Sequence, residues 1–357
     1  RRSSDLYHLS GSNTQQMMLC KFKTNGDLDA TFGNAVPISG CQINQSSAMP
    51  DYAPGIDNRM MALARLPDGR FIGAWTDKVD STNNSIKLAR FTANGQIEVG
   101  GFGNPNTGIA APLATNTSLL VHDIAVRSDG AIFFAGSFLS SAPDNVDGFV
   151  VGLSGAGALT GYTSVNAGGQ GAGPDVATSV AVLPNNDVVV AGYSDRNGIR
   201  SGLFMQFTGE LLNQVFTGFT AAINIFQICG GGCVNQPVYD IAIQPDGKVL
   251  LAGIFKANGN SPDTDPYVLR LNADMSGLDT NFGASGVSYL NPDTANDTSS
   301  MLTARLFDAV ARIHFIGGRP FVVGLHGISF DPNNPVPSFP FVARLENDLI
   351  FADSFEF

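Results

Sequence analysis

Closely spaced aspartates recur between the apolar segments of this sequence, and their side chains could bind a metal ion. Two pairs stand out, Asp144 with Asp147 and Asp263 with Asp265. Carboxylates that lie a few residues apart among asparagines and backbone carbonyls are the ligands that Ca²⁺ prefers. However, the chain has no complete D-x-[DN]-x-[DN]-G loop, and Asp and Asn are common in turns for conformational reasons. We therefore expect no cofactor and a solvated acidic rim, with a structural Ca²⁺ site at these four residues as the alternative.

Two other aspartates, Asp123 and Asp240, stand at equivalent places before apolar strands. A carboxylate there could line a channel and act as a general acid or base. A position that recurs with a repeat is more simply structural, because a carboxylate can bind backbone amides where a strand begins. We favour the structural interpretation for both.

The histidines form no linear catalytic motif. None belongs to an HExxH pair, so a zinc hydrolase is not expected, and no G-x-S-x-G nucleophile motif is present. A Ser-His-Asp triad is not visible at this level, because its members come together only in space. The four histidines are His8, His122, His314 and His326.

The four cysteines predict two disulfides. Cys20–Cys41 and Cys229–Cys233 are favoured over the other two connectivities, and a zinc site lacks a second Cys or His pair at suitable spacing. Disulfides form in oxidising compartments, so an extracellular or cell-surface protein is expected. The sequence begins with Arg1 rather than Met, which is consistent with a removed signal peptide and leaves open whether Arg1 is the native N-terminus.

The segment YDIAIQPDGKVLLAG at 239–253 indicates how the residues above are positioned. Two apolar runs flank Asp246-Gly247, and an Asp-Gly pair favours a tight hairpin turn because Gly adopts positive φ at little cost. Similar hairpins recur about 60 residues apart, which is typical of a propeller or solenoid. The other Asp-Gly turns are Asp68-Gly69 and Asp129-Gly130, with a further copy of the hairpin at 180–192 and a looser one at 309–324.

A second motif follows the hairpins, most fully as LDATFG at 28–33 and LDTNFG at 278–283. Its aromatic residues are Phe32, Phe102 and Phe282, which we expect to pack between neighbouring blades and to contribute about 2 kcal/mol each. Trp75, the single tryptophan, stands where other copies have Gly, and we expect it to fill a gap between blades.

The combination of a PDGKVLLAG-like hairpin with an LDTNFG-like tail resembles the delta-60 β-propeller repeat, and the strand order is similar to that of NHL-like propellers. The ending LIFADSFEF at 349–357 resembles the IFADGFE-type ending of exported proteobacterial proteins. This resemblance implies a propeller fold and a bacterial secreted or surface protein, but no fixed activity.

Six tails against five complete hairpins predict an all-β, six-bladed β-propeller of four-stranded blades, whose first blade lacks its innermost strand within this chain. Trimmed residues, a neighbouring chain or a loop could fill that gap. We expect one domain over residues 1-357. Its units lie at approximately 1-58, 59-118, 119-175, 176-235, 236-300 and 301-357.

Composition narrows the range of partners. A net charge of −11 with no basic stripe disfavours nucleic acid, because phosphate binding depends on clustered Lys and Arg. No apolar run is long enough for a membrane span. We expect other copies of the chain, or an extracellular protein or polysaccharide, as the partner.

Because no catalytic constellation is visible, we expect no enzyme. The interpretation is a non-catalytic extracellular propeller that acts as a structural, adhesive or self-assembling surface protein, which could form filaments by strand donation. The alternatives are a propeller hydrolase or lyase with its site at the channel mouth, and a Ca²⁺-dependent carbohydrate-binding module. The identity of the ligand and the assembly state stay open.

Overall fold

The computed structural model of the chain contains strands and no helix in the residues that it describes, as the all-β prediction requires. The described residues are 2–8, 15–33, 39–44, 60–78, 84–114, 119–139, 146–165, 173–196, 199–207, 237–256, 264–290, 307–316, 319–328, 339–346 and 349–351. Within this part of the chain there is consequently no helix that could cross a membrane.

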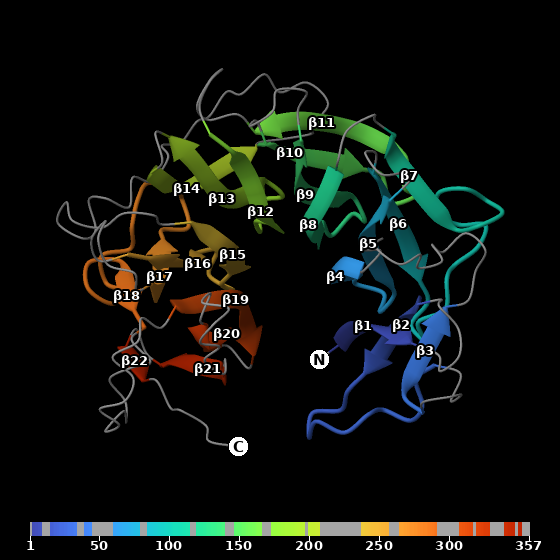
Figure 1. Ribbon diagram of the computed structural model, residues 1–357, viewed down its shortest axis with the longest axis horizontal. Helices are drawn as coiled ribbons and strands as arrows, with labels where there is room; N and C mark the ends of the chain where they lie inside the picture. The colour runs from blue at the N-terminus through green and yellow to red at the C-terminus, as the bar shows by residue number, and fades with distance from the viewer. Residues whose placement is uncertain are drawn as a thin grey trace, which may run out of the picture. The chain divides into compact units, whose positions relative to one another are not determined.

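The chain divides into two compact units. Unit 1 holds three antiparallel sheets, which we number in chain order (Figure 1). The first sheet consists of β1 (Arg2–His8), β2 (Gln15–Lys21) and β3 (Cys41–Asn44). The second consists of β4 (Met60–Arg65), β5 (Phe71–Lys78), β6 (Asn84–Phe91) and β7 (Ile109–Ala114). The third consists of β8 (Leu119–Val126), β9 (Ile132–Leu139), β10 (Val146–Leu153) and β11 (Leu159–Val165).

Unit 2 holds the fourth, fifth and sixth sheets. The fourth consists of β12 (Asp175–Val182), β13 (Val188–Arg196) and β14 (Ile199–Phe207). The fifth consists of β15 (Val238–Ile243), β16 (Val249–Phe255), β17 (Asp265–Leu271) and β18 (Val287–Tyr289). The sixth consists of β19 (Phe307–Ile316), β20 (Arg319–Ile328), β21 (Phe339–Glu346) and β22 (Leu349–Phe351).

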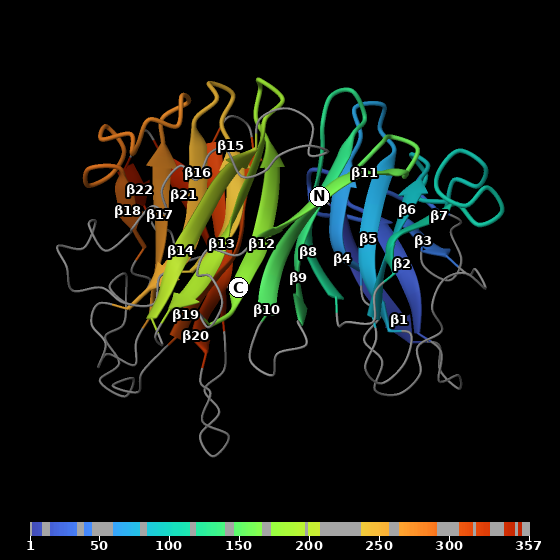
Figure 2. The ribbon, with the colours of Figure 1, turned by 90° about the horizontal axis from the view of Figure 1, so that it is seen from above.

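Each sheet is an up-and-down meander in which strands pair in chain order. The first strands of neighbouring sheets contact one another, β4 with β8 in unit 1 and β15 with both β12 and β19 in unit 2. We call the edge formed by these first strands the inner edge of each unit. In unit 1 the described hairpin turns lie together at one end of the sheets (Figure 2).

The hairpin turns have the conformation that their Asp-Gly pairs favour. Gly69, Gly130 and Gly247 adopt φ values of +89°, +90° and +85°, which an L side chain rarely adopts. In each turn the preceding Asp accepts a hydrogen bond from the backbone N–H two residues on, for example from Arg70 N to Asp68 Oδ1 at 3.0 Å. The carboxylate and the glycine therefore act together to fix the register of the hairpin.

The core consists of layers between neighbouring sheets. Phe32 lies between the first and second sheets, Phe102 between the second and third, and Phe282 between the fifth and sixth, each 2% exposed. The ring of Phe32 meets Gly95 and that of Phe102 meets Gly157, both turn glycines of the following sheet. A side chain at either glycine would collide with the ring, so the two residues of each pair depend on each other.

Trp75 is fully buried between the first and second sheets, where it packs with Leu19 and Phe32. Its place is held by a glycine in other sheets, and there an aromatic ring from the adjacent strand covers the glycine. Phe149 lies across from Gly136, and Tyr267 lies across from Gly253. In the third and fifth sheets the ring thus comes from the third strand of the sheet. In the second sheet it comes from Trp75 on the second strand, β5.

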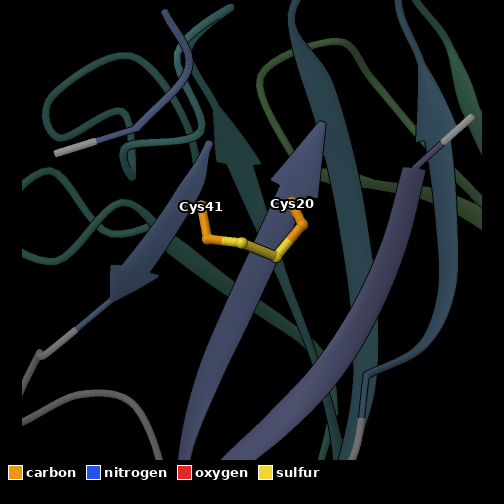
Figure 3. Close-up of a disulfide and its surroundings, with 2 residues drawn as sticks. All are labelled: Cys20 and Cys41. Carbon is orange, nitrogen blue, oxygen red and sulfur yellow. A yellow bond between two sulfur atoms is a disulfide. The ribbon is translucent and has the colours of Figure 1, made fainter. Parts of the chain in front are cut away.

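A disulfide joins β2 to β3 (Figure 3). Cys20 and Cys41 are directly paired residues of the two strands, and both are buried. The Cys229–Cys233 pairing lies outside the described residues and stays a prediction.

Candidate functional site

The inner-edge strands carry a β-bulge at the same place in five sheets. The extra residue falls between Met60 and Ala62 in β4, and between Val121 and Asp123 in β8. Bulges re-aim a side chain and are common beside functional sites. The bulge residues are Met61, His122, Thr178, Tyr239 and Ala311.

His122 is the bulge residue whose chemistry suits proton transfer near neutral pH. Its Nε2 atom makes a 2.9 Å hydrogen bond with Oγ of Ser137 on β9. Ser137 is buried at 4% exposure, whereas the imidazole is half-buried and reaches the surface of unit 1. The serine therefore holds the ring, and the ring is the group that a substrate could contact.

The second sheet fixes the backbone that carries His122. Thr76 of β5 is buried, and its Oγ1 accepts a 3.3 Å hydrogen bond from Val121 N, immediately before the bulge. This bond joins two sheets of unit 1 at the residue next to the histidine.

Two bulge residues of unit 2 have other roles. Thr178 is structural, because its hydroxyl donates to the carbonyl oxygen of Val238 in the next sheet at 2.8 Å. Burial raises the pKa of the Tyr239 phenol, which keeps it protonated at neutral pH. Neither side chain is a base under ordinary conditions.

Asp240 connects three sheets of unit 2. One carboxylate oxygen accepts from Ser179 Oγ at 3.0 Å, and the other accepts from Ile313 N at 2.7 Å. Arg312 lies 3.5 Å from the same group, which is 4% exposed. The Asp240 carboxylate accepts from a backbone N–H, as the sequence suggested. However, Asp240 lies within β15 rather than before it, and the N–H belongs to Ile313 of the next sheet. Asp123 occupies the equivalent place in β8 and is half-buried.

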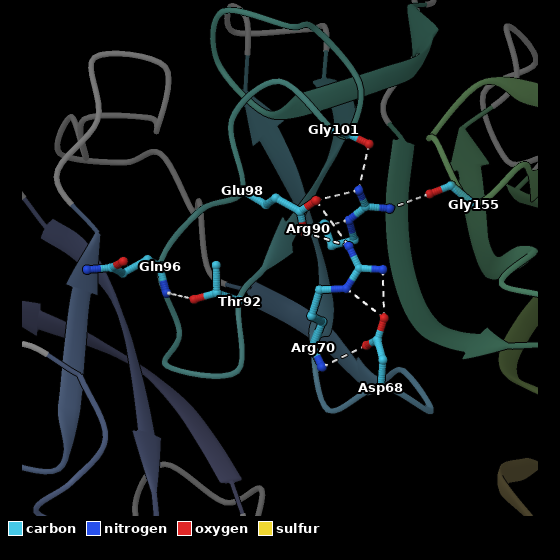
Figure 4. A network of polar contacts seen from close by, with 8 residues as sticks. All are labelled: Asp68, Arg70, Arg90, Thr92, Gln96, Glu98, Gly101 and Gly155. Atoms are coloured by element: carbon cyan, nitrogen blue, oxygen red, sulfur yellow. Dashed lines mark hydrogen bonds and ion pairs between the residues drawn. The ribbon is translucent and has the colours of Figure 1, made fainter.

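A charged network lies at the turn end of the second sheet (Figure 4). Arg90 holds Glu98 through Nε and Nη2 at 2.9 and 2.6 Å, and Arg70 holds the same carboxylate at 2.8 Å. Arg90 also donates to the carbonyl oxygens of Gly101 and Gly155. Arg90 lowers the pKa of Glu98 more than Arg70 does. Because Gly155 belongs to the turn before β11, the network joins the second sheet to the third.

The fifth sheet repeats this arrangement. Arg270 and Lys248 both hold Asp279 at 2.9 Å, and Arg270 lies over the ring of Phe282 at 4.6 Å. In the first sheet Lys21 pairs with Asp29. The basic residue of the third strand was not singled out in the sequence analysis. Its recurrence 11 or 12 residues before the aromatic residue of the tail, as in Lys21 before Phe32 and Arg90 before Phe102, is the signal that could have revealed it.

The structure describes one aspartate of each predicted Ca²⁺-binding pair. Asp147 and Asp265 lie at equivalent places near the start of β10 and β17, and both are half-buried. Asp144 and Asp263 lie outside the described residues. Among the described residues no three His, Cys, Asp or Glu side chains form a group that could hold a metal ion. The Ca²⁺ site stays a prediction.

A cavity of about 580 Å³ opens in unit 1 between β7 and the turn before β11. Its lining includes Asn104, Thr107, Pro112 and Leu159. Lys87 is the titratable residue among the described residues that line it. The cavity thus lacks an acid and base pair of its own.

Several solved structures are similar to the chain. A polysaccharide lyase of family PL25, an ulvan lyase, is 11% identical with a TM-score of 0.42, over 84% of this chain and 72% of the lyase. The GH43 endo-arabinanase from Bacillus licheniformis is 12% identical with a TM-score of 0.42, over 80% of this chain and 93% of the arabinanase. The GH93 α-L-arabinofuranosidase of Fusarium graminearum is 10% identical with a TM-score of 0.46, over 81% of each chain. At these values no substrate or catalytic residue is carried over to this chain.

The expectation of a non-catalytic structural, adhesive or self-assembling protein is contradicted by this comparison, in which the similar proteins are enzymes. No linear motif could have indicated the His122–Ser137 hydrogen bond, because these two residues meet only when β8 pairs with β9.

No curated protein sequence matches the chain. Two of its segments, residues 66–100 and 244–282, match a family described as a domain of unknown function (DUF5122) β-propeller. These segments contain the charged side chains of the two networks and the turns Asp68-Gly69 and Asp246-Gly247. Together with the successive up-and-down sheets, the match identifies the fold as a β-propeller built from repeats.

Proposed function

We propose that the chain is a secreted β-propeller enzyme, a hydrolase or lyase, in which His122 is the general acid and base and Ser137 orients its ring. The observation that carries this proposal is the 2.9 Å hydrogen bond between His122 Nε2 and Ser137 Oγ at the bulge of an inner-edge strand. In propellers the inner strands line the central channel, where a substrate can reach them from one end.

The architecture that we propose has six blades of the delta-60 type. Support comes from the six sheets of the described residues and from the tails LDATFG and LDTNFG. Lys21 of β2 stands at the place of Arg90 in β6. The strands β1–β3 then correspond to the second to fourth strands of a blade, so that the first blade has no innermost strand of its own among the described residues. The disulfide between Cys20 and Cys41 is compatible with an extracellular location.

The chemistry follows from the imidazole. A neutral imidazole accepts a proton and a protonated imidazole returns it, so one ring can act as both base and acid. In a hydrolase the protonated ring would give its proton to the leaving oxygen while water attacks. In a lyase the neutral ring would remove the proton next to a carboxylate, and the bond to the leaving oxygen would break by elimination. Ser137 keeps the ring in one orientation in both cases.

The test is a panel of neutral and acidic polysaccharides, with two readouts for each. New reducing ends report hydrolysis, and the ultraviolet absorbance of an unsaturated product reports elimination. The variants are His122→Gln and Ser137→Ala. His314→Gln is the matched control, because His314 is an exposed histidine on another inner-edge strand.

We expect His122→Gln to lower the rate on the responsive polysaccharide about 100-fold or more. Ser137→Ala should shift the pH profile of the rate, because the hydroxyl biases the orientation and protonation of the ring. His314→Gln should leave the rate unchanged. Activity of His122→Gln equal to that of the wild type, or no activity of the wild type on any polysaccharide, would refute the proposal.

A further inference from the structure

The third sheet lacks the charged network of the second and fifth sheets. The register of the hairpins and tails aligns three positions: Arg70 with Ala131, Arg90 with Gly152, and Glu98 with Thr160. The replacements are small or uncharged, so the space that two guanidinium groups and a carboxylate fill in the second sheet is left open in the third.

A cavity of about 240 Å³ lies in that space. It is smaller than a typical pocket for a drug-sized ligand, which begins at about 300 Å³. The cavity belongs entirely to the third sheet and its turns, within unit 1. Its lining includes Arg127, Asp129, Phe133, Leu153, Ser154 and Thr160.

Arg127 is the residue that distinguishes this cavity. The equivalent residue of the second sheet is the apolar Leu66, so the third sheet has a charged residue where the second has an apolar one. Its side chain is only 12% exposed and lies 5.4 Å over the ring of Phe133. It donates from Nε and Nη2 to Asp129, a carboxylate that is 56% exposed.

The lining offers a mixed set of polar groups over an apolar wall. The Arg127–Asp129 pair supplies donors and acceptors without net charge, and Ser154 and Thr160 supply hydroxyls. The almost fully buried side chains of Phe133 and Leu153 complete the lining. Vicinal hydroxyls can donate to a carboxylate and accept from a guanidinium at the same time.

We propose that this cavity binds one neutral sugar unit, with two adjacent hydroxyls on the Arg127–Asp129 pair. A neutral sugar fits better than an anionic one, because the local pair is already neutral and the chain carries a net charge of −11. The cavity lies at the turn end of the sheet, away from the 2.9 Å pair of His122 and Ser137 in the strands. The proposal does not require catalysis, so binding is measured without turnover.

The experiment is saturation-transfer NMR, followed by titration, of the full chain with arabinose, xylose, galactose, glucose, mannose and, as the anionic probe, galacturonate. In two variants, the substituted residues are those found at the equivalent positions of the second sheet. Arg127→Leu installs the residue of the second sheet. Ala131→Arg with Thr160→Glu refills the cavity with the network residues. Arg70→Ala in the second sheet is the control, because it alters a charged turn residue but leaves this cavity intact.

We expect saturation transfer to at least one neutral sugar, an affinity about tenfold weaker in Arg127→Leu, and no transfer in the refilled variant. Arg70→Ala should bind as the wild type does. Circular dichroism spectra that match the wild type show that the variants are folded. The proposal is overturned if no neutral sugar binds, if only galacturonate binds, or if both cavity variants bind like the wild type. Since these readouts do not involve His122, they are independent of the polysaccharide assay.

Discussion

Arg90 Nη1 donates a 2.7 Å hydrogen bond to the carbonyl oxygen of Gly155, and this bond joins the second sheet to the third. The same guanidinium holds Glu98 through its other nitrogens. One planar side chain thus satisfies a carboxylate of its own sheet and a backbone carbonyl of the next, a task that needs the forked geometry of arginine.

Replacing Arg90 with methionine should lower the free energy of unfolding by about 2 to 3 kcal/mol, because the half-buried carbonyl of Gly155 and part of the Glu98 carboxylate lose their donors. Arg90→Lys should recover only a part of this loss. Denaturant unfolding followed by circular dichroism measures both. Arg65→Met is the control, since Arg65 is exposed in the same sheet and should change stability by less than about 0.5 kcal/mol. Equal losses in the two methionine variants would contradict the assigned role of Arg90.

The network also predicts a dependence of stability on acid. The arginines hold the pKa of Glu98 below its ordinary value of 4.5, so its contribution is fully present above that value. It is lost as the pH falls through the lowered folded-state pKa. The difference in unfolding free energy between the wild type and Glu98→Gln should therefore be greatest near neutral pH and shrink in acid. A difference that stays constant from neutral pH to about pH 2 would show that the ionised form of Glu98 is not stabilised.

Trp75 gives a third prediction, because it is the single tryptophan and is fully buried. Its fluorescence emission should be blue-shifted and protected from iodide in the folded protein. Trp75→Gly should cost about 4 kcal/mol, since no ring on the adjacent strand would fill the cavity. Trp75→Phe should cost less. If acrylamide and iodide quench the native protein as strongly as the denatured one, the residue is not in the core.

The Cys20–Cys41 disulfide should stabilise the first sheet, because it closes a loop over a sequence separation of 21 residues. Replacing both cysteines with serine should lower stability by about 3 kcal/mol in the chain-entropy model. Mass spectrometry of a non-reduced digest checks the linkage, and thermal unfolding measures the loss. A double variant as stable as the wild type would mean that neighbouring packing alone holds β2 to β3.

Part of this fold could be predicted from local chemistry. The turns at Asp68, Asp129 and Asp246 follow from short-range rules, since an Asx side chain and a glycine suffice to set the conformation. The places of Phe32 and Phe102 between sheets follow from one aromatic residue per repeat. Both features can be predicted from residues that are close in sequence or that recur at the same place in each repeat.

The candidate site needed the tertiary structure. The sequence does not show that β8 bulges at His122, because the extra residue is defined only by the pairing with β9. Nor does it show that Ser137 comes within hydrogen-bond reach. The cavity in the third sheet exists because large charged side chains are absent from it. Ala131, Gly152 and Thr160 can be recognised as their replacements only when the strand register aligns them with the network of the second sheet.

The bulge separates two kinds of position within one strand. The residues on either side of it pair with the adjacent strand and fix the register, whereas the bulge residue takes no part in that pairing. A histidine, a threonine and a tyrosine therefore occupy the same geometric place without disturbing their sheets. At a position such as His122, whose hydrogen bond to Ser137 lies within its own sheet, the chemistry of the inner edge can therefore change while the register of the strands stays constant.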